Sequence, residues 1–243
     1  MKPAVITGAS IEDAARKLAG RFYAEATARA KQNGMLYVAL SGGRTPLPFF
    51  QVLVREYAGV MPWQNIHFFW ADERCVPPDH QESNYGLARA SLFAPLGIPS
   101  AHLHRIHGES NPGEEVLRYA SEIVRYLPLR QGLPVFDIIF LGIGQDGHVA
   151  SIFPGQEEKL FSSTEIAADS VHPVTGQQRI TLTGTVLNHA SHIFFFVTGK
   201  EKASLIASIF HSSGRNRQYP VQWVDPLHGD CTWFLDEEAT SLL

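Results

Sequence analysis

An aspartate and a histidine stand two residues apart, at Asp146 and His148, just beyond an apolar run over 136–142. A carboxylate beside an imidazole can orient the ring and fix which nitrogen carries the proton, and such a neutral histidine can act as a general base. We therefore interpret His148 as a candidate general base that Asp146 orients. The alternative at this point is a histidine that only caps or packs against the loop.

Glycines in the same loop raise the question of a nucleotide site. Gly142, Gly144 and Gly147 match the G-x-G-x-x-G spacing of dinucleotide-binding loops. That fingerprint needs a crossover helix directly after the loop, whereas Pro154 and Gly155 would end any helix after a few residues. The sequence therefore argues against an NAD site here.

A second loop, over 41–46, follows an apolar strand expected at 35–40 and precedes an expected helix. Paired glycines let the backbone approach a ligand closely, and the N-terminus of a helix attracts anions. Thr45 is a suitable N-cap residue, and Pro46 suits the first helical position. The loop indicates an anion site or, equally, a plain strand-to-helix turn, and it is not a Walker A motif.

A third loop carries three consecutive charges, Asp72, Glu73 and Arg74, after an apolar strand expected at 66–71. Side chains alternate along an extended segment, so Asp72 and Arg74 are expected on one side, facing a ligand. Glu73 would then turn to solvent or to a helix cap. The alternative is a solvated turn.

Composition excludes several classes of protein. Of 243 residues, 44% are hydrophobic and 18% charged, which is ordinary for a folded globular chain and unlike a disordered one. The net charge of −4 gives no basic excess for binding nucleic acid. Apolar runs are far shorter than the ~20 residues that span a bilayer, and no signal peptide is visible. We therefore expect a cytoplasmic protein with no membrane partner.

Cysteines and clustered histidines give no clear metal signal. Cys75 and Cys231 are too far apart for a zinc-site spacing and fit free thiols in a reducing compartment. His102, His104 and His107 lie close together, but their spacing completes no recognised ligand set. We interpret these histidines as structural or surface residues, with a metal site as the less favoured alternative.

Short apolar runs alternate with helical patterns along the chain, which indicates crossover connections and a mostly parallel sheet covered on both faces. The sequence thus predicts an α/β fold, a single Rossmann-like three-layer α/β/α sandwich over residues 1–243. In such folds ligands bind beyond the carboxyl ends of the strands. Strands are expected at 4–6, 35–40, 66–71, 102–106, 136–142, 180–183, 192–199, 221–224 and 231–236, and helices at 11–32, 46–57, 84–93, 113–127 and 200–211.

Taken in order, the loops resemble the motifs of a known family. The segments are SGGRTP, ADERCVP with SNYG, GIGQDGHVASIFPG, RITLT with LNHA, VTGKEKA and CTWFLDEEA, and together they extend over nearly the whole chain. They are similar to those of the 6-phosphogluconolactonases, within the glucosamine-6-phosphate isomerase/lactonase superfamily. The resemblance implies a Rossmann-like sandwich that does not bind NAD, and hydrolysis of a sugar-phosphate lactone with no metal and no cofactor.

The resemblance also separates the chain from a close relative. Glucosamine-6-phosphate deaminases carry a DGHIAFNEP-type segment whose glutamate helps to open the sugar ring, and Phe153 stands at that place here. A phenyl ring cannot transfer protons, so a deaminase or isomerase is the less favoured alternative, together with a non-catalytic sugar-phosphate sensor. The chain departs from the family pattern at Arg44, where serine is frequent, and at Gly184-Thr185, where Leu-Pro is frequent.

The resemblance implies a role for individual residues. His148 would act as the base, oriented by Asp146. Arg74 would lie near the lactone carbonyl or its developing oxyanion, and Asp72 would order Arg74 or contact sugar hydroxyls. The only partner expected is the small-molecule substrate, and the chain is expected to act as a monomer or a small homo-oligomer. The phosphate would be held by Ser41, Gly42, Gly43, Arg44, Thr45, Arg179 and Lys200.

Overall fold

The computed structural model describes residues 4–211 and 217–243. Its first helix, α1 (Ile11–Lys31), begins at the predicted cap. The Ser10 hydroxyl accepts a hydrogen bond from the backbone N–H of Asp13, and the Asp13 carboxylate accepts one from the N–H of Ala9. Ser10 thus satisfies a backbone N–H group that a helix start leaves without a partner, and Asp13 ties the residue before the cap to the first turn.

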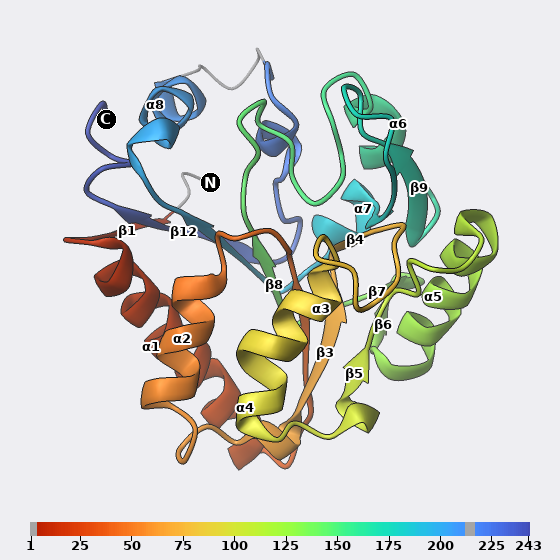
Figure 1. Cartoon of the computed structure of the whole chain (residues 1–243), viewed down its shortest axis with the longest axis horizontal. Helices are drawn as coiled ribbons and strands as arrows, with labels where there is room; N and C mark the ends of the chain where they lie inside the picture. Colours follow the sequence, from red (N-terminus) through yellow and green to blue (C-terminus); the bar gives the residue numbers. More distant parts are fainter. Residues whose placement is uncertain (1–3, 212–216) are drawn as a thin grey trace.

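Seven strands form the main sheet (Figure 1). Every pairing between its neighbouring strands is parallel, which agrees with the predicted crossover connections. Loops that follow the strands therefore gather at one edge of the sheet. In spatial order the strands are β1 (Ala4–Gly8), β12 (Asp230–Asp236), β11 (His192–Val197), β8 (Ile138–Leu141), β2 (Leu36–Leu40), β3 (Ile66–Trp70) and β5 (Leu103–His104).

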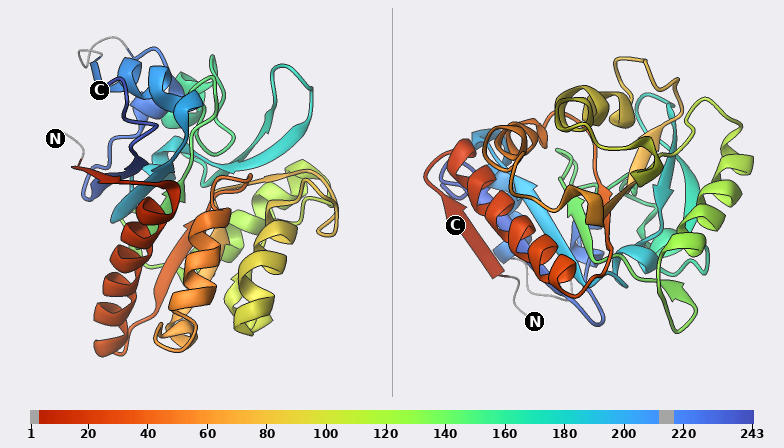
Figure 2. Two further views of the ribbon diagram at one scale, coloured as in Figure 1. Left: turned by 60° about the vertical axis from the view of Figure 1, so that its left-hand side comes forward. Right: turned by 90° about the horizontal axis from the view of Figure 1, so that it is seen from below.

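Helices cover both faces of this sheet and complete the predicted three layers (Figures 1 and 2). On one face, Phe22 of α1 packs edge-on against Phe140 of β8, with ring centroids 5.3 Å apart. On the other face, Phe210 packs against Trp233 of β12 at 5.2 Å. Within the described residues, no helix is long and apolar enough to cross a membrane. The first face also carries α2 (Leu47–Glu56), α3 (Asn84–Ala88) and α4 (Ala94–Leu96), and the second carries α5 (Pro112–Tyr126) and α8 (Ala203–His211).

A second, three-stranded antiparallel sheet lies beside the carboxyl ends of the main strands, and the sequence did not predict it (Figure 1). Its strands, in order, are β4 (Asp72–Arg74), β10 (Gln178–Leu182) and β9 (Ala167–Val171). The strand expected at 180–183 belongs to this sheet as β10. β4 consists of three charged residues and β9 has little apolar alternation, so neither gives a strand signal by itself.

One predicted strand is wrong. The segment expected as a strand over 221–224 forms a 3₁₀ helix over Pro220–Trp223, and the side chain of Gln222 accepts a hydrogen bond from the N–H of Tyr219. Proline has no N–H for a sheet and suits the first position of a helix, which explains the difference. The remaining short strands and α-helices are β6 (Leu129–Arg130), β7 (Leu133–Pro134), α6 (Glu157–Phe161) and α7 (Gly184–Leu187), and a π-helical turn over Arg89–Phe93 joins α3 to α4.

Candidate active site

A cavity of about 260 Å³ opens where the carboxyl ends of β2, β3 and β8 meet the small sheet. Open α/β sheets bind their ligands at this edge. All three loops singled out in the sequence reach the wall of this cavity, although they lie far apart in the chain. Eight of the predicted site residues line it: Ser41, Gly42, Gly43, Thr45, Asp72, Arg74, His148 and Arg179.

His148 and Asp146 form a hydrogen-bonded pair at this cavity. His148 Nδ1 lies 2.6 Å from a carboxylate oxygen of Asp146, which also accepts the backbone N–H of His148 at 3.2 Å. Burial opposes the charge of Asp146, but the imidazole and these hydrogen bonds together hold its pKa below the ordinary value. An ionised carboxylate can only accept, so Nδ1 carries the proton. The lone pair of Nε2, which has no partner in the described residues, is left to accept another proton.

Two glycines of this loop have local structural reasons, and Gly144 is explained by the histidine pair. A Cβ on Gly144 would lie 2.1 Å from His148 Nδ1, so glycine allows the imidazole and the carboxylate to fold over the backbone. Gly147 has a φ of 78° and packs against the ring of Tyr219. Residues 142–156, all of them described, form no helix, and the next helix begins only at Glu157. The loop therefore lacks the strand–turn–helix geometry that places a pyrophosphate at a helix N-terminus.

Arg74 and Arg179 lie directly opposite each other on β4 and β10. Opposite side chains of an antiparallel pair share a face of the sheet, and both of these reach the cavity. Arg105 and Arg118 elsewhere each contact a glutamate at 2.6 Å, whereas the Nε atoms of Arg74 and Arg179 are buried and have no hydrogen-bond partner among the residues described. Burial, and then the charge of Arg74, lower the pKa of Arg179. Two neighbouring cations with this little compensation favour an anionic ligand.

Asp72 lies on the same face of the small sheet as Arg74, and a hydrogen bond from Ser151 fixes its carboxylate. Its side chain is 6% exposed, and one carboxylate oxygen accepts a hydrogen bond from Ser151 Oγ at 2.7 Å. The N–H of Ser151 donates to Thr181 Oγ1, and Thr181 lies opposite Asp72 on β10. Sequence reasoning missed Ser151, because nothing in its motif places it beside a residue of another loop.

Glu73 points away from the cavity, as alternation along β4 requires. Burial raises the pKa of Glu73, although its hydrogen bonds oppose that effect. The carboxylate caps the start of α3, so the predicted split between Glu73 and its two neighbours is confirmed. It accepts hydrogen bonds from the N–H groups of Arg74, Asn84 and Tyr85 and from the Ser83 hydroxyl.

Asn84 lines the cavity and was also missed in the sequence. Its Nδ2 donates to the backbone carbonyl oxygen of Asp72 at 2.8 Å, and its Oδ1 is buried with no hydrogen-bond partner in the described part of the chain. Gly42 packs directly on this amide, since a Cβ there would lie 1.7 Å from Oδ1. Gly42 is therefore required for close packing of the glycine loop on the start of α3.

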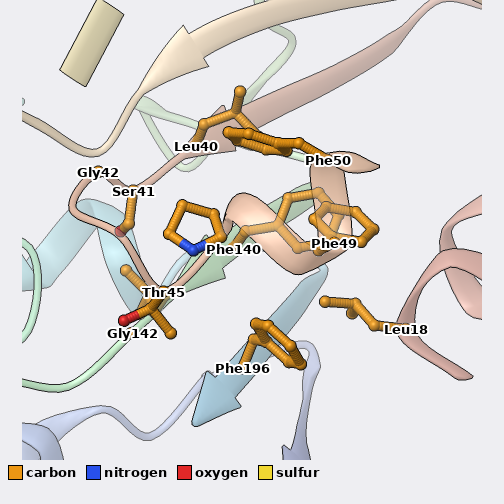
Figure 3. A pocket seen from close by; sticks show the side chains of 12 residues that line it. Leu18, Leu40, Ser41, Gly42, Thr45, Phe49, Phe50, Phe140, Gly142 and Phe196 are labelled. Carbon is orange, nitrogen blue, oxygen red and sulfur yellow. The ribbon is translucent and has the colours of Figure 1, made fainter. Parts of the chain in front are cut away.

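The glycine loop packs next to a cluster of aromatic rings (Figure 3). Behind it lies a second cavity of only about 20 Å³, lined mostly by apolar side chains (Figure 3). The hydroxyls of Ser41 and Thr45 lie on the side of Gly42, away from the rings of Phe49 and Phe50 (Figure 3). Thr45 was expected as an N-cap, but α2 begins without a side-chain cap. The described residues give its hydroxyl no hydrogen bond, so it is available to a ligand in the larger cavity.

Two predicted phosphate ligands do not line the cavity. Arg44 is exposed on the glycine loop, and Lys200 is exposed at the start of a 3₁₀ turn over Lys200–Lys202. Lys202, in the same turn, does not line the cavity either but contacts a residue that does. Its Nζ donates to the carbonyl oxygen of Ile143, a cavity residue, at 2.9 Å, and burial lowers the pKa of its ammonium group. Two residues of a tight turn project in different directions, and the motif alone does not show which one faces inward.

The histidines that suggested a metal lie away from the cavity. His104 Nε2 lies 2.8 Å from Nδ1 of His67, and His104 Nδ1 lies 2.7 Å from Glu122. The ring of His102 stacks on His67 with centroids 4.6 Å apart. His107 belongs to a different group around a buried glutamate. Among the residues described, no group of three or more His, Cys, Asp or Glu side chains is arranged to hold a metal ion.

Comparisons with known proteins agree with this geometry. Residues 9–233 match the family described as Glucosamine-6-phosphate isomerases/6-phosphogluconolactonase. A 6-phosphogluconolactonase of Treponema pallidum is 38% identical over 218 residues, which cover 89% of each chain. One of Haemophilus influenzae is 39% identical over 212 residues, covering 87% of this chain and 89% of that one. A solved 6-phosphogluconolactonase from Trypanosoma brucei is 26% identical and has a TM-score of 0.90 over 100% of this chain and 99% of that one. The chain therefore belongs to the glucosamine-6-phosphate isomerase/6-phosphogluconolactonase family.

Proposed function

We propose that this protein hydrolyses 6-phospho-D-glucono-1,5-lactone to 6-phospho-D-gluconate, a step of the oxidative pentose phosphate pathway. The observation that carries the proposal is a single cavity that holds His148 Nε2 and the guanidinium groups of Arg74 and Arg179, for which the described residues supply no carboxylate partner. The names of the two curated relatives support it. We extend the proposal to a single-domain cytoplasmic enzyme that acts as a monomer or a small homo-oligomer.

The proposed base is His148. Its Nε2 takes a proton from a water molecule, and the oxygen of that water attacks the carbonyl carbon of the lactone. Asp146, 2.6 Å from Nδ1, stabilises the positive charge that forms on the imidazole. The proton then passes to the ring oxygen as the ring C–O bond breaks, which gives the open-chain acid. A lactone is already a reactive ester, so a base and charge stabilisation supply the chemistry required.

Negative charge develops on the carbonyl oxygen during attack, and Arg74 is the proposed group that stabilises it. Arg74 donates to the carbonyl oxygen of Glu82, which fixes its guanidinium at the cavity wall. Asp72 faces the same cavity with one carboxylate oxygen bound by Ser151. Its other oxygen is available to a sugar hydroxyl or to the guanidinium of Arg74.

The phosphate is proposed to lie between the glycine loop, Arg179 and Lys202. The backbone of Gly42 and Gly43 and the hydroxyl of Thr45 offer donors at the start of α2. Arg179 supplies a planar fork and Lys202 a point charge, both suited to phosphate oxygens. Binding energy gained at the phosphate orients the distant carbonyl toward His148.

The family also includes isomerases, and one residue favours the lactonase. Phe153 is 1% exposed and lines the cavity, and its ring centroid lies 4.8 Å from that of His148. A phenyl ring can hold the imidazole in place but cannot move the proton that opening of a sugar ring requires.

The direct test is acid release from freshly prepared 6-phosphogluconolactone, corrected for spontaneous hydrolysis. We expect catalysed hydrolysis that survives chelation with EDTA and needs no nicotinamide nucleotide, and no ammonia from glucosamine 6-phosphate. Ammonia release without lactone hydrolysis would overturn the proposal in favour of a deaminase.

The charges proposed to bind the phosphate can be tested by removing Arg179 and Lys202, with the exposed Lys200 as a control for Lys202. Arg179→Ala and Lys202→Ala should raise the KM for the phosphorylated lactone roughly 10- to 100-fold, the effect of losing a charged hydrogen bond. Both variants should lose little activity on unphosphorylated gluconolactone. Lys200→Ala, two residues away and exposed, is the control and should resemble the unchanged protein. Equal losses on both substrates would assign Arg179 and Lys202 a structural role only.

A further inference from the structure

His172 is a second histidine on the wall of the cavity, and the mechanism above gives it no role. It directly follows β9, at the turn that joins β9 to β10, in a hairpin that projects from the body of the molecule (Figure 2). Ser170, two residues earlier, lies opposite Arg179. Alternation along the strand therefore puts His172 on the same face of the small sheet as this arginine.

The hydrogen bonds of His172 define its tautomer. Its Nδ1 accepts the backbone N–H groups of Val174 and Thr175, each at 3.2 Å. A backbone N–H can only donate, so Nδ1 keeps its lone pair and the proton of the neutral ring is on Nε2. Nε2 makes no hydrogen bond within the described residues, so the ring brings an unpaired N–H donor to the cavity.

His148 has the opposite tautomer, because Asp146 accepts its Nδ1 proton and leaves Nε2 as an acceptor. Both imidazoles pack on the ring of Phe153, with centroid distances of 4.8 Å for His148 and 4.9 Å for His172. Phe153 is buried and so fixes the position of both rings. The cavity thus presents one acceptor imidazole and one donor imidazole, held by the same phenyl ring.

We propose that His172 is a specificity-determining residue that donates a hydrogen bond from Nε2 to a ring hydroxyl of the lactone. This inference rests on the proposed lactonase function. The charged oxygens of the substrate are matched by Arg74, Arg179 and Lys202, whose charged donors bind them more strongly than a neutral N–H does. A neutral N–H donor is suited to a neutral hydroxyl oxygen.

A neighbouring acceptor on the cavity wall supports a hydroxyl as the ligand. Asp72 lines the cavity, and the carboxylate oxygen that does not contact Ser151 makes no hydrogen bond within the described residues. This oxygen can accept the proton of a sugar hydroxyl but cannot satisfy its lone pairs. A donor such as His172 Nε2 completes the hydrogen bonding of a hydroxyl in the same cavity.

Three substitutions separate donation to the substrate from a structural role in the turn. His172→Asn places a carbonyl oxygen near the position of Nδ1, so it can still accept from the turn, but its amide is too short to replace Nε2. His172→Gln places an amide donor near the position of Nε2 and gives up the contact with the turn. His172→Phe keeps a ring against Phe153 and loses both functions.

We expect His172→Asn to lower kcat/KM for 6-phosphogluconolactone roughly threefold to tenfold, the effect of one neutral hydrogen bond, with little change in the thermal midpoint. His172→Gln should retain most of the activity, and His172→Phe should lose it as His172→Asn does. The loss should be equal on unphosphorylated gluconolactone, since the contact is to the sugar. In a series of monodeoxy lactones, the analogue that lacks the hydroxyl bound by His172 should be a poor substrate of the unchanged protein. His172→Asn should not lower kcat/KM for this analogue any further.

The opposite ranking overturns the proposal. If His172→Asn matches the unchanged protein while His172→Gln and His172→Phe lose stability and activity together, His172 only caps the turn. If every monodeoxy lactone is further impaired by His172→Asn, no hydroxyl is its partner. A failure of the unchanged protein to hydrolyse the lactone would contradict the proposed function instead, so the two failures are distinguishable.

Discussion

Two imidazole–carboxylate pairs in this molecule have nearly the same length and very different surroundings. His148 Nδ1 lies 2.6 Å from Asp146, and His104 Nδ1 lies 2.7 Å from Glu122. The second nitrogen of His148 has no partner in the described residues and belongs to a ring on the cavity wall. The second nitrogen of His104 is hydrogen-bonded to His67, which lies near the beginning of β3, whereas the cavity lies beyond its end.

The difference shows that a carboxylate beside a histidine is not by itself a catalytic feature. A carboxylate fixes the tautomer in both places, but only an imidazole whose second nitrogen has no partner can take a proton from a water molecule in the cavity. The chain His67–His104–Glu122 joins β3, β5 and α5 through hydrogen bonds and so secures the edge of the sheet. We therefore expect the first pair to control turnover and the second to control stability.

Replacing the two histidines should give the largest contrast. His148→Ala removes the proposed base and should lower the turnover of 6-phosphogluconolactone roughly 10²–10⁴-fold, with the fold intact. His148→Gln should behave similarly, because an amide cannot take up the proton. His104→Gln should leave turnover nearly unchanged and lower the free energy of unfolding by about 1–3 kcal/mol, since its buried partners lose a hydrogen bond. Lactone hydrolysis and urea unfolding measure the two effects.

Either half of this contrast can fail separately. Near-normal turnover of a His148 variant would show that His148 is not the base. Loss of turnover in a folded His104→Gln protein would remove the functional distinction between the two pairs.

Exchanging each carboxylate for an amide should give a smaller contrast. Asp146→Asn should lower kcat roughly 10- to 10³-fold, because an amide N–H₂ beside Nδ1 favours the wrong tautomer and carries no charge to stabilise the imidazolium. Glu122→Gln should keep kcat and lower the free energy of unfolding by about 1 kcal/mol. Steady-state kinetics and thermal unfolding of the two variants provide the comparison. Equal kcat values would mean that Asp146 does not orient the base.

Local patterns in the sequence predicted those parts of the fold that neighbouring residues decide. The cap at Ser10 and the apolar strands of the main sheet are examples, because each is encoded within a few consecutive residues. The small sheet escaped prediction for the opposite reason. Asp72–Arg74 becomes a strand only by pairing with β10, which lies far along the chain. The strand expected at 221–224 is wrong because Pro220 suits the first position of a helix and lacks the N–H that a sheet needs.

In the candidate site, too, the sequence predicted the residues that are close together in the chain and missed those that tertiary contacts bring together. Asp146 and His148 are close in sequence, so their spacing alone indicated a pair. Ser151 and His172 reach the cavity through tertiary contacts with β10 and Phe153, which no local pattern contains. The proposal of Lys202 in place of Lys200 has a third cause, because the orientation of a short 3₁₀ turn decides which lysine contacts a cavity residue.

The smallest expected effect is a loss of protein stability at low pH that arises from His67, the hydrogen-bond partner of the His104–Glu122 pair. Burial, and then the neighbouring His102 and His104, lower the pKa of His67 from the ordinary 6.5 to about 4. Burial also lowers the pKa of His104, although Glu122 opposes this. The folded protein therefore keeps His67 neutral down to about pH 4, whereas the unfolded chain takes up that proton near pH 6.5. Unfolding binds a proton in this interval, so stability is full above pH 6.5 and decreases as the pH falls toward 4.

His67→Asn tests this origin of acid sensitivity, because asparagine does not titrate and its amide can replace the Nδ1 donor to His104. The thermal midpoint of the unchanged protein should fall by several degrees between about pH 7 and pH 5, and that of the variant should fall less. The readout is the difference between the thermal midpoints measured at the two pH values, since the substitution can also shift both midpoints equally.

His228→Asn, at an exposed histidine, is the matched control and should keep the full pH dependence. If the thermal midpoints of His67→Asn and His228→Asn fall by the same amount between pH 7 and pH 5, the buried histidines do not cause the loss of stability in acid. Turnover of the folded His67→Asn protein at pH 7 should stay unchanged, because its ring lies outside the cavity wall.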